Sequence, residues 1–381
     1  MYHKNKKMSG IYIHVPYCKR KCNYCDFYSV ASGSGKDKFA NLIEKEIELR
    51  VNFLDNRTIE TIYFGGGTPS MLPTDDIEKI LRAIAKHFTV NPNSEITLEA
   101  NPDDLSLEYL FALRKTGVNR LSIGVQSFCD SDLKQLDRRH DAAQAINAVN
   151  DAHKAGFSDI SIDLIYGLPY STNQIWEQNL AQAFALPITH LSCYHLIYEM
   201  GTPLDRKVKS GLVKPVDEDI SVEQFELLQL YAQQFAFEHY EISNLSKKGH
   251  HSRHNTSYWK QIPYLGLGPS AHSYNGVTRC WNAKSIEQWG KSIENGLANP
   301  EAETLTETDK INEYFITSLR TIWGADLSYI SSNFGKKVAN TARKLSEKYA
   351  KEGIMAIDGN IIKIIPKHFF TSDGVIVDFL M

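Results

Sequence analysis

The sequence predicts an α/β fold in which six strand–helix units form an incomplete parallel barrel, followed by a small α+β unit of winged-helix type. Short β-rich runs alternate with longer helical patterns through the first half of the chain. Polar or glycine-rich residues stand at the ends of these runs, where a parallel barrel places its site. After residue 300, helices and a hairpin replace the alternation.

The six expected strands are residues 11–15, 61–64, 95–100, 120–126, 159–166 and 190–198. Helical periodicity occupies residues 36–51, 74–87, 105–115, 142–155 and 172–185 between them. A strand followed by a helix, repeated in this way, is typical of βα units around a parallel sheet. Six units leave an eight-fold barrel incomplete.

The second half of the chain begins with a helical pattern at residues 222–235, and residues 240–281 then show little periodicity. Thr306 and Asp309 form a capping-box pattern that predicts the start of a helix. A further helix at 338–350 precedes a hairpin of residues 354–357 and 361–365. We therefore divide the chain into a barrel at 9–238, a linking segment at 239–300 and a winged-helix-like domain at 301–381.

Basic residues gather on the helix expected at 338–350, and a winged helix often binds DNA. We favour the alternative, a solvated helix face. The formal net charge of −3 gives no sign of attraction to nucleic acid or membranes. We therefore expect no nucleic-acid partner.

The composition is that of an ordinary globular protein, with 42% apolar and 23% charged residues among 381. The apolar run at residues 11–17 is too short for a secretion signal and contains His14. No run approaches the roughly 18 apolar residues of a membrane span. We expect a cytoplasmic protein with at most peripheral membrane association, in a compartment that keeps thiols reduced.

Three cysteines near the start, Cys18, Cys22 and Cys25, are spaced C-x3-C-x2-C. Structural zinc sites and electron-transfer clusters normally have four protein ligands. Three thiolates can hold three irons of a four-iron cluster and leave the fourth iron open to a reacting ligand. A zinc site remains the alternative, although the other cysteines are scattered singly. The incomplete ligand set predicts chemistry at the metal.

The segment from Gly10 through Cys25 and Phe27 resembles the cluster loop of the radical S-adenosylmethionine (SAM) enzymes. More narrowly, it is similar to the branch that holds oxygen-independent coproporphyrinogen III oxidase and the HemW-type heme chaperones. Motifs of that branch follow in the same order from about Ile11 to the C-terminus. The resemblance implies an open (β/α)6 barrel, a [4Fe-4S] cluster, SAM and an electron donor for the cluster.

A glycine run, Gly65-Gly66-Gly67-Thr68, follows the strand expected at 61–64. Glycines at this place let backbone groups approach a ligand closely, although a plain turn also explains them. Neither glycine-rich phosphate motif is present. In the family this loop contacts the methionine part of SAM, which implies that role for Gly66, Gly67 and Thr68.

Four polar residues at or near strand ends are further candidates. Glu99 is placed to accept hydrogen bonds from ribose hydroxyls, or is a surface charge beside a turn. Asp163 lies inside an apolar strand, where an unpaired charge is costly. Gln126 ends a strand, and Arg138, expected on the following helix, either pairs with a carboxylate or lies on the surface. Positions that contact SAM in the family match these four residues and also Tyr12, Tyr24 and Ile197.

For two sets of histidines, the sequence is compatible with both a structural and a functional role. His14 is either a satisfied core residue or part of the strand-end site. His250 and His254 would share one face of a helix, where metal binding is conceivable, or lie on a surface loop. Histidine ligates heme iron, and aromatic rings pack on the macrocycle. The segment His254-Asn-x-x-Tyr-Trp259 resembles the H-N-x-x-Y-W signature of HemW-type chaperones, which implies that His254 holds heme.

Two departures separate the chain from the oxidases. Those enzymes carry a further cysteine two residues after the cluster motif, where this chain has Phe27, and a longer N-terminal arm. The resemblance therefore implies a chaperone that binds heme and delivers it to apo-hemoproteins, respiratory enzymes among them. Oxidative decarboxylation of coproporphyrinogen III is the alternative. No residue is assigned to catalysis.

Overall fold

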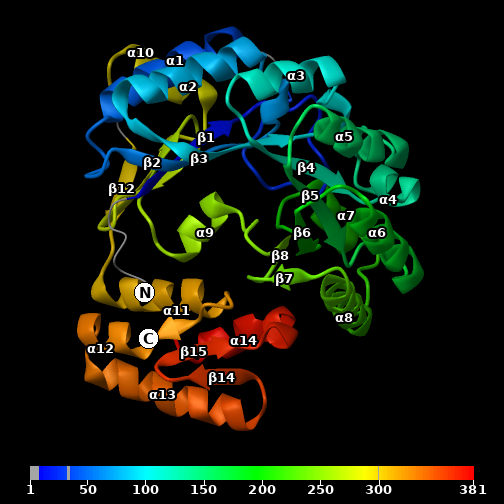
Figure 1. Ribbon diagram of the computed structural model, residues 1–381, viewed down its shortest axis with the longest axis vertical. Coiled ribbons are helices and arrows are strands. Elements are labelled where there is room, and N and C mark those ends of the chain that lie inside the picture. The colour runs from blue at the N-terminus through cyan, green and yellow to red at the C-terminus, as the bar shows by residue number, and fades with distance from the viewer. Residues whose placement is uncertain (1–7, 32–34, 299) are drawn as a thin grey trace.

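A mixed sheet of twelve strands forms the centre of the computed structural model, which describes residues 8–31, 35–298 and 300–381 (Figure 1). Its six parallel neighbours are β1 (Ser9–Val15), β2 (Thr58–Gly66), β3 (Thr89–Ala100), β4 (Arg120–Gln126), β5 (Asp159–Tyr166) and β6 (His190–His195). Strands β1, β4 and β5 are buried almost throughout, as expected for parallel strands covered on both faces. The predicted α/β class with a partial barrel is confirmed.

Helices cover the outer side of these strands (Figure 1). They are α1 (Lys36–Arg50), α2 (Thr74–His87), α3 (Leu107–Lys115), α4 (Asp130–Gln135), α5 (Ala142–Lys154), α6 (Asn173–Ala185), α7 (Pro203–Lys209) and α8 (Glu218–Gln234). Helix α2 buries Ile77, Ile80 and Ile84 on one face, and this spacing is what the sequence pattern detects. Helices α4 and α7 are short, and the sequence pattern does not predict them.

Four short strands extend the sheet beyond β1. They are β9 (Tyr264–Leu267), β10 (His272–Tyr274), β11 (Thr278–Trp281) and β12 (Glu301–Thr304). β9 runs parallel to β1, and the other three follow in antiparallel order. On the opposite edge, β8 (Asn244–Lys247) and β7 (Phe237–His239) follow β6. The expectation of an irregular segment at 240–281 is therefore wrong, because strands of three or four residues carry too little alternation to be recognised.

Helix α9 (Arg253–Trp259) lies on the open side of the sheet, between the strands and the C-terminal helices (Figure 1). The carboxylate of Glu95 on β3 accepts the backbone N–H groups of Arg253 at 2.8 Å and His254 at 2.9 Å. Ser252 accepts a third N–H, that of Asn255. These contacts satisfy donors that every helix start leaves without an intrahelical partner, so they hold α9 against the strands.

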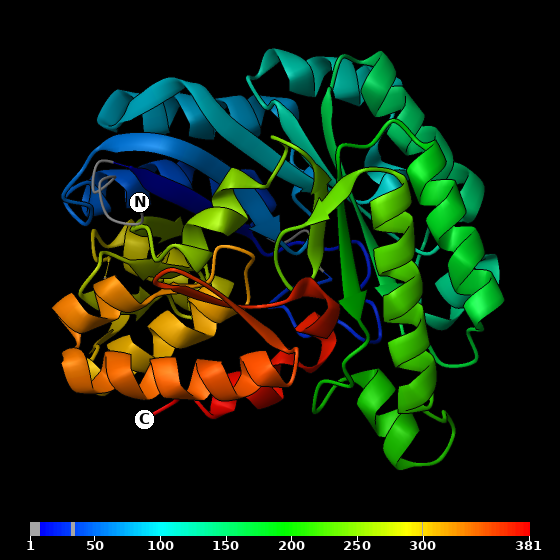
Figure 2. The same cartoon turned by 60° about the horizontal axis from the view of Figure 1, so that its bottom comes forward.

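The C-terminal unit contains helices and a three-stranded sheet, and Figure 2 turns it toward the viewer. Its elements are α11 (Glu307–Leu319), β13 (Ala325–Asp326), α12 (Leu327–Asn333), α13 (Lys336–Lys351), β14 (Met355–Asp358), β15 (Ile361–Ile364) and α14 (Ser372–Val377). The predicted capping box of Thr306 and Asp309 is confirmed at the start of α11. Because β12 still pairs within the large sheet, the chain leaves that sheet only at Thr304. The three-part domain division stays a prediction.

Short 3-10 helices join some of these elements, at η1 (Pro69–Met71), η2 (Pro102–Asp104) and η3 (Pro366–Thr371). The remaining helix, α10 (Ile286–Glu294), packs against α1. None of the helices in the described ranges is long and apolar enough to cross a bilayer.

A buried ion pair joins the added strands to helix α1. Glu46 and Arg50 are both buried, with 3.5 Å between their charged atoms. Glu46 accepts hydrogen bonds from the Gly268 backbone and from the side chains of Asn282 and Trp289. Arg50 donates to the Gly266 carbonyl at 2.8 Å and to Ser273 at 3.0 Å. The pair therefore links helix α1 to β9, β10 and α10.

Replacing Glu46 with alanine is expected to lower the free energy of unfolding by about 3 kcal/mol, since Arg50 would stay buried without its counter-charge. Glu48→Ala is the matched control. It removes an exposed carboxylate of the same helix and is expected to cost less than about 1 kcal/mol. Denaturant unfolding of both variants gives the comparison, and equal losses would contradict the role of the pair.

Candidate functional site

The three cysteines of the C-x3-C-x2-C motif lie in the loop that follows β1, and each is partly buried. The hydroxyl of Thr68 donates to the Cys18 sulfur at 3.3 Å, and Arg138 donates to the Cys22 sulfur at 3.5 Å. Burial raises the pKa of Cys25, and the nearby Cys22 and Cys18 raise it further. Donors aimed at sulfur stabilise thiolates, so Cys18 and Cys22 have the surroundings that thiolate ligands need, and the backbone hydrogen bond from Phe27 acts in the same direction at Cys25.

The residues of this loop fit a four-iron cluster. Its three cysteines lie in one short loop, and in such a cluster each thiolate binds a different iron. Cys18, Cys22 and Cys25 would each hold one iron.

The glycine loop after β2 packs directly under the cysteine loop. The Gly67 N–H donates to the Val15 carbonyl and the Thr68 N–H to the Tyr17 carbonyl, each at 2.8 Å. A Cβ atom on Gly67 would lie 2.7 Å from the Tyr17 oxygen and 3.1 Å from the Cys18 sulfur. Only glycine allows this approach, so the alternative of a plain turn does not describe Gly67.

A cavity of about 450 Å³ opens at the carboxyl ends of the strands and gathers most of the predicted cofactor residues. Nine of the ten residues predicted to contact SAM line it: Tyr24, Gly66, Gly67, Thr68, Glu99, Gln126, Arg138, Asp163 and Ile197. Cys25 lies on its wall, and Phe27, which is 69% exposed, stands at its edge. The structure therefore brings together residues from strands β2 to β6 and from the loops around them, among them Tyr24 and Ile197, which are 173 positions apart in the chain.

Two carboxylates form the polar floor of this cavity. Glu99 accepts hydrogen bonds from the Tyr63 hydroxyl at 2.8 Å and from the Gly66 N–H at 3.1 Å. Burial raises its pKa from 4.5 to about 7. Burial also raises the pKa of Asp163 from 3.8 to about 6, although Ser192 and Ser122 donate hydrogen bonds to it. The alternative of a surface charge at Glu99 is wrong. Oriented acceptors of this kind would bind the hydroxyls of a ribose.

Arg138 lies beside the carboxylates, but the structure corrects its expected place on a helix. Helix α4 ends at Gln135, and Arg138 follows in the loop after it. Its guanidinium donates to the Asn101 side chain and to the Gly124 carbonyl, both at 2.7 Å. The surface alternative is wrong, because Arg138 lines the cavity and its Nε is buried with no hydrogen-bond partner among the described residues. An unsatisfied buried donor at a cavity wall is suited to a carboxylate ligand.

Gln126 and Ile197 reach the cavity from the ends of β4 and β6. Gln126 has a φ of 69°, a left-handed conformation that is unusual outside glycine and that re-aims the chain at the strand end. Ile197 lies beyond β6, which ends at His195 rather than at the predicted residue 198, and is 64% exposed at the rim. Sequence reasoning missed Asn101 and His195, which line the cavity, and Tyr63, which donates to Glu99, because nothing in their local patterns marks these roles.

Tyr12 is the predicted contact that does not line the cavity. Its ring lies below it, against Gly65, and its hydroxyl shares a hydrogen bond of 3.0 Å with His14 Nδ1. His14 is buried, and its second ring nitrogen bonds to the Tyr28 carbonyl at 2.9 Å. Both nitrogens of His14 are therefore engaged within the protein, which describes a satisfied core histidine.

His254 is not on a surface loop. It lies in helix α9, only 1% exposed, with its ring stacked on Tyr63 at a centroid distance of 4.9 Å. Its Nδ1 bonds to Thr61 and its Nε2 to the Tyr258 hydroxyl, both at 2.8 Å. Burial lowers its pKa to about 3, so the ring is neutral. Because α9 begins at Arg253, His250 does not share a helix face with His254, and the alternative of a metal-binding pair on one helix face is wrong.

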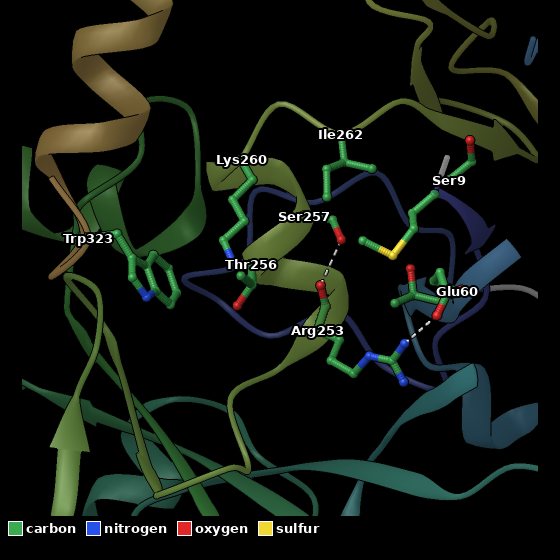
Figure 3. A pocket seen from close by; sticks show the side chains of 10 residues that line it. Ser9, Glu60, Arg253, Thr256, Ser257, Lys260, Ile262 and Trp323 are labelled. Carbon is green, nitrogen blue, oxygen red and sulfur yellow. Dashed lines mark hydrogen bonds and ion pairs between the residues drawn. The ribbon is translucent and has the colours of Figure 1, made fainter. Parts of the chain in front are cut away.

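The outer side of α9 lines a second cavity, of about 330 Å³, at the opposite ends of the strands (Figure 3). Arg253 donates to Glu60 at 2.6 Å across its floor. Lys260 lies 4.6 Å from the centre of the Trp323 ring, which belongs to the segment after α11. Arg253 is therefore paired with Glu60, and Lys260 packs on Trp323. The cavity lies at the contact between α9 and the segment after α11.

The fold and the cavity at the strand ends define the class of protein. Residues 12–182 match the family model of the Radical SAM superfamily. This class implies a [4Fe-4S] cluster and SAM. Among solved structures, coproporphyrinogen III oxidase (HemN) from Escherichia coli has a TM-score of 0.84 and 24% identity, covering 99% of this chain and 91% of that one. At this identity the likeness is one of fold.

Two curated relatives narrow the class to a family. The chain is 32% identical to the heme chaperone HemW of Bacillus subtilis over 352 residues, which are 91% of this chain and 93% of that relative. It is 37% identical to the heme chaperone HemW of Mycobacterium tuberculosis over 279 residues, 72% of each chain. The chain belongs to the HemW family.

Gly67→Ala is expected to lower iron incorporation several-fold, because the added methyl group would displace the backbone that supports Cys18. The measurement is iron content and charge-transfer absorbance after anaerobic reconstitution. Gly290→Ala is the control, since its Cβ would meet only the flexible end of Leu42, at 3.4 Å. A folded Gly67→Ala protein with full cluster absorbance would show that the close approach is not required.

Without SAM, the protein is expected to lose stability as the pH rises from about 4.5 to 8. The raised pKa of Glu99 means that the native state keeps a proton that the unfolded chain releases, so the contribution is present at low pH and lost through pH 7. The full shift is worth on the order of 3 kcal/mol. Glu99→Gln is expected to flatten the pH dependence of the melting temperature, whereas Glu48→Gln leaves it unchanged. An unaltered slope in Glu99→Gln would exclude Glu99 as its source.

Proposed function

We propose that this protein is a radical SAM heme chaperone, which binds heme beside the segment from His254 to Trp259 and delivers it to apo-hemoproteins in the cytoplasm, respiratory enzymes among them. The single observation that carries the proposal is the match over nearly the whole chain to a relative named heme chaperone HemW. The motif helix supports it, because Glu95 holds α9 in a defined place on the open side of the barrel strands.

The cavity at the strand ends would hold SAM and the cluster. Cys18, Cys22 and Cys25 would ligate three irons, and Glu99 would accept the ribose hydroxyls. Arg138 would face the carboxylate of SAM, while Gly66, Gly67 and Thr68 border the same space. When bound, the cluster and SAM supply one-electron chemistry, and the protein supplies orientation and exclusion of water. An external electron donor for the cluster is part of the proposal.

Phe27 separates this function from oxidative decarboxylation of a porphyrinogen. It stands at the mouth of the cavity, largely exposed, where the oxidases are expected to carry a cysteine. A phenyl ring has no ionisable or redox-active group. The cavity edge therefore lacks the thiol that the alternative activity is expected to use at this place.

One anaerobic preparation tests the two functions together. We expect the reconstituted protein to take up heme in stoichiometric amounts and to pass it to an apo-cytochrome, measured by the Soret band of the acceptor after separation. With coproporphyrinogen III, SAM and a reductant, we expect no protoporphyrinogen IX by chromatography. The variant with Cys18, Cys22 and Cys25 all changed to serine controls for the cluster and is expected to lose its brown absorbance. Formation of protoporphyrinogen IX would overturn the proposal.

A further inference from the structure

A groove of about 680 Å³ lies beside the end of helix α9, between strands β9 to β12 and helix α11. Its volume is within the range of roughly 300–1,000 Å³ that small-molecule and cofactor sites occupy. Aromatic and imidazole rings dominate its lining: Tyr258, Tyr264, His272, Tyr274 and Trp281. Tyr258 belongs to the H-N-x-x-Y-W segment, so the motif contributes directly to the wall of this groove.

Strand register explains why these rings share one face. Tyr274 pairs with Tyr264 on one side and with Arg279 on the other. His272 pairs with Trp281, and their rings stack with centroids 5.9 Å apart. Paired residues point to the same face of a sheet, so β9, β10 and β11 present a continuous aromatic surface. A flat macrocycle packs well on such a surface.

The two histidines near the groove differ in whether a ring nitrogen is available to bind iron. Both ring nitrogens of His254 are hydrogen-bonded to buried partners, and iron ligation would break one of these bonds. His272 is exposed, and no hydrogen bond or ion pair to its ring occurs within the described residues. Partial burial and the nearby Arg279 and Lys284 lower the pKa of His272, so its ring is neutral at neutral pH. A neutral imidazole is the form that binds iron.

The charged groups around the groove are paired in a way that leaves one side for heme propionates. Arg279 bonds to Glu313 at 2.6 Å and lies 3.5 Å from Glu303. Glu313 and Glu303 share this one arginine, so a negative charge remains at that part of the groove. Lys284 is exposed and close enough to His272 to lower its pKa. Propionates directed toward Lys284 avoid like charges.

We propose that heme binds in this groove with His272 as an axial iron ligand, and that His254 is a positioning residue that holds Tyr258 in the groove wall. The proposal rests on the proposed function, because it names the place and the ligand of the cargo. His254 fixes the Tyr258 hydroxyl through a hydrogen bond, and the Tyr258 ring packs edge-to-face on Tyr264 with centroids 4.7 Å apart. These two contacts connect the barrel interior with the groove wall.

Heme titration of the full-length reconstituted protein tests the ligand. In His272→Ala, we expect the spectrum of histidine-ligated heme to be lost, by absorption and electron paramagnetic resonance, and the affinity to fall on the order of tenfold. One equivalent of added imidazole is expected to restore the nitrogen-ligated spectrum of the bound heme. His153→Ala, which removes an exposed histidine of α5, is the matched control and is expected to behave as the unmodified protein. Cluster absorbance verifies that each variant is folded.

The positioning role of His254 is tested by the heme affinity and the heme spectrum of two further variants. His254→Ala and Tyr258→Phe are each expected to keep the axial spectrum and to weaken heme binding by similar factors, with the double variant no weaker than either one. A His272→Ala protein that binds heme with the native spectrum would overturn the ligand assignment and leave the proposed function intact. Loss of the axial spectrum in His254→Ala with retention in His272→Ala would also overturn it. Failure of the unmodified protein to bind heme would overturn the proposed function itself.

Discussion

The carboxylate of Glu95 holds helix α9 on the open side of an incomplete barrel, and much of the remaining architecture depends on that contact. Two backbone N–H groups of the helix start point at one buried carboxylate. A third donor is satisfied by Ser252, whose own N–H lies 3.3 Å from the Tyr240 hydroxyl. An open parallel sheet would otherwise expose its interior polar groups at this end, and an unsatisfied buried group is costly. Helix α9 therefore closes the barrel where further strands would close a complete one.

A column of rings connects this closing helix with the cofactor cavity. His254 stacks on Tyr63, and the Tyr63 hydroxyl donates to Glu99 on the cavity floor. In the other direction, His254 bonds to Tyr258, which lines the aromatic groove. The column explains why the motif histidine is buried and neutral rather than exposed. It also means that the carboxylate expected to bind SAM and the groove proposed for heme share one set of packed side chains.

Strands β9 to β12 form one wall of a second concave surface, separate from the cavity at the strand ends. They extend the sheet beyond β1 and are tied to helix α1 through the buried pair of Glu46 and Arg50. Their exposed side carries the rings of the groove, and helix α11 supplies the facing wall. A barrel site alone would offer one cavity at the strand ends. The added strands and the C-terminal unit create a separate concave surface, which supports the proposal that cofactor and heme bind at different places.

The sequence by itself determined the alternation of strands and helices, the capping box of Thr306, and the cysteine and glycine loops, because each depends on residues close together in the chain. It also indicated nine of the residues that line the cofactor cavity, since the carboxyl ends of parallel strands meet at one edge. Only the tertiary structure decided that Glu99 lies on a cavity floor, that His254 is buried, that Arg138 reaches the cavity from a loop, and that β9 to β12 extend the sheet. These facts depend on contacts between segments far apart in the chain, such as Thr61 with His254 and Glu46 with Asn282, and no local pattern encodes them.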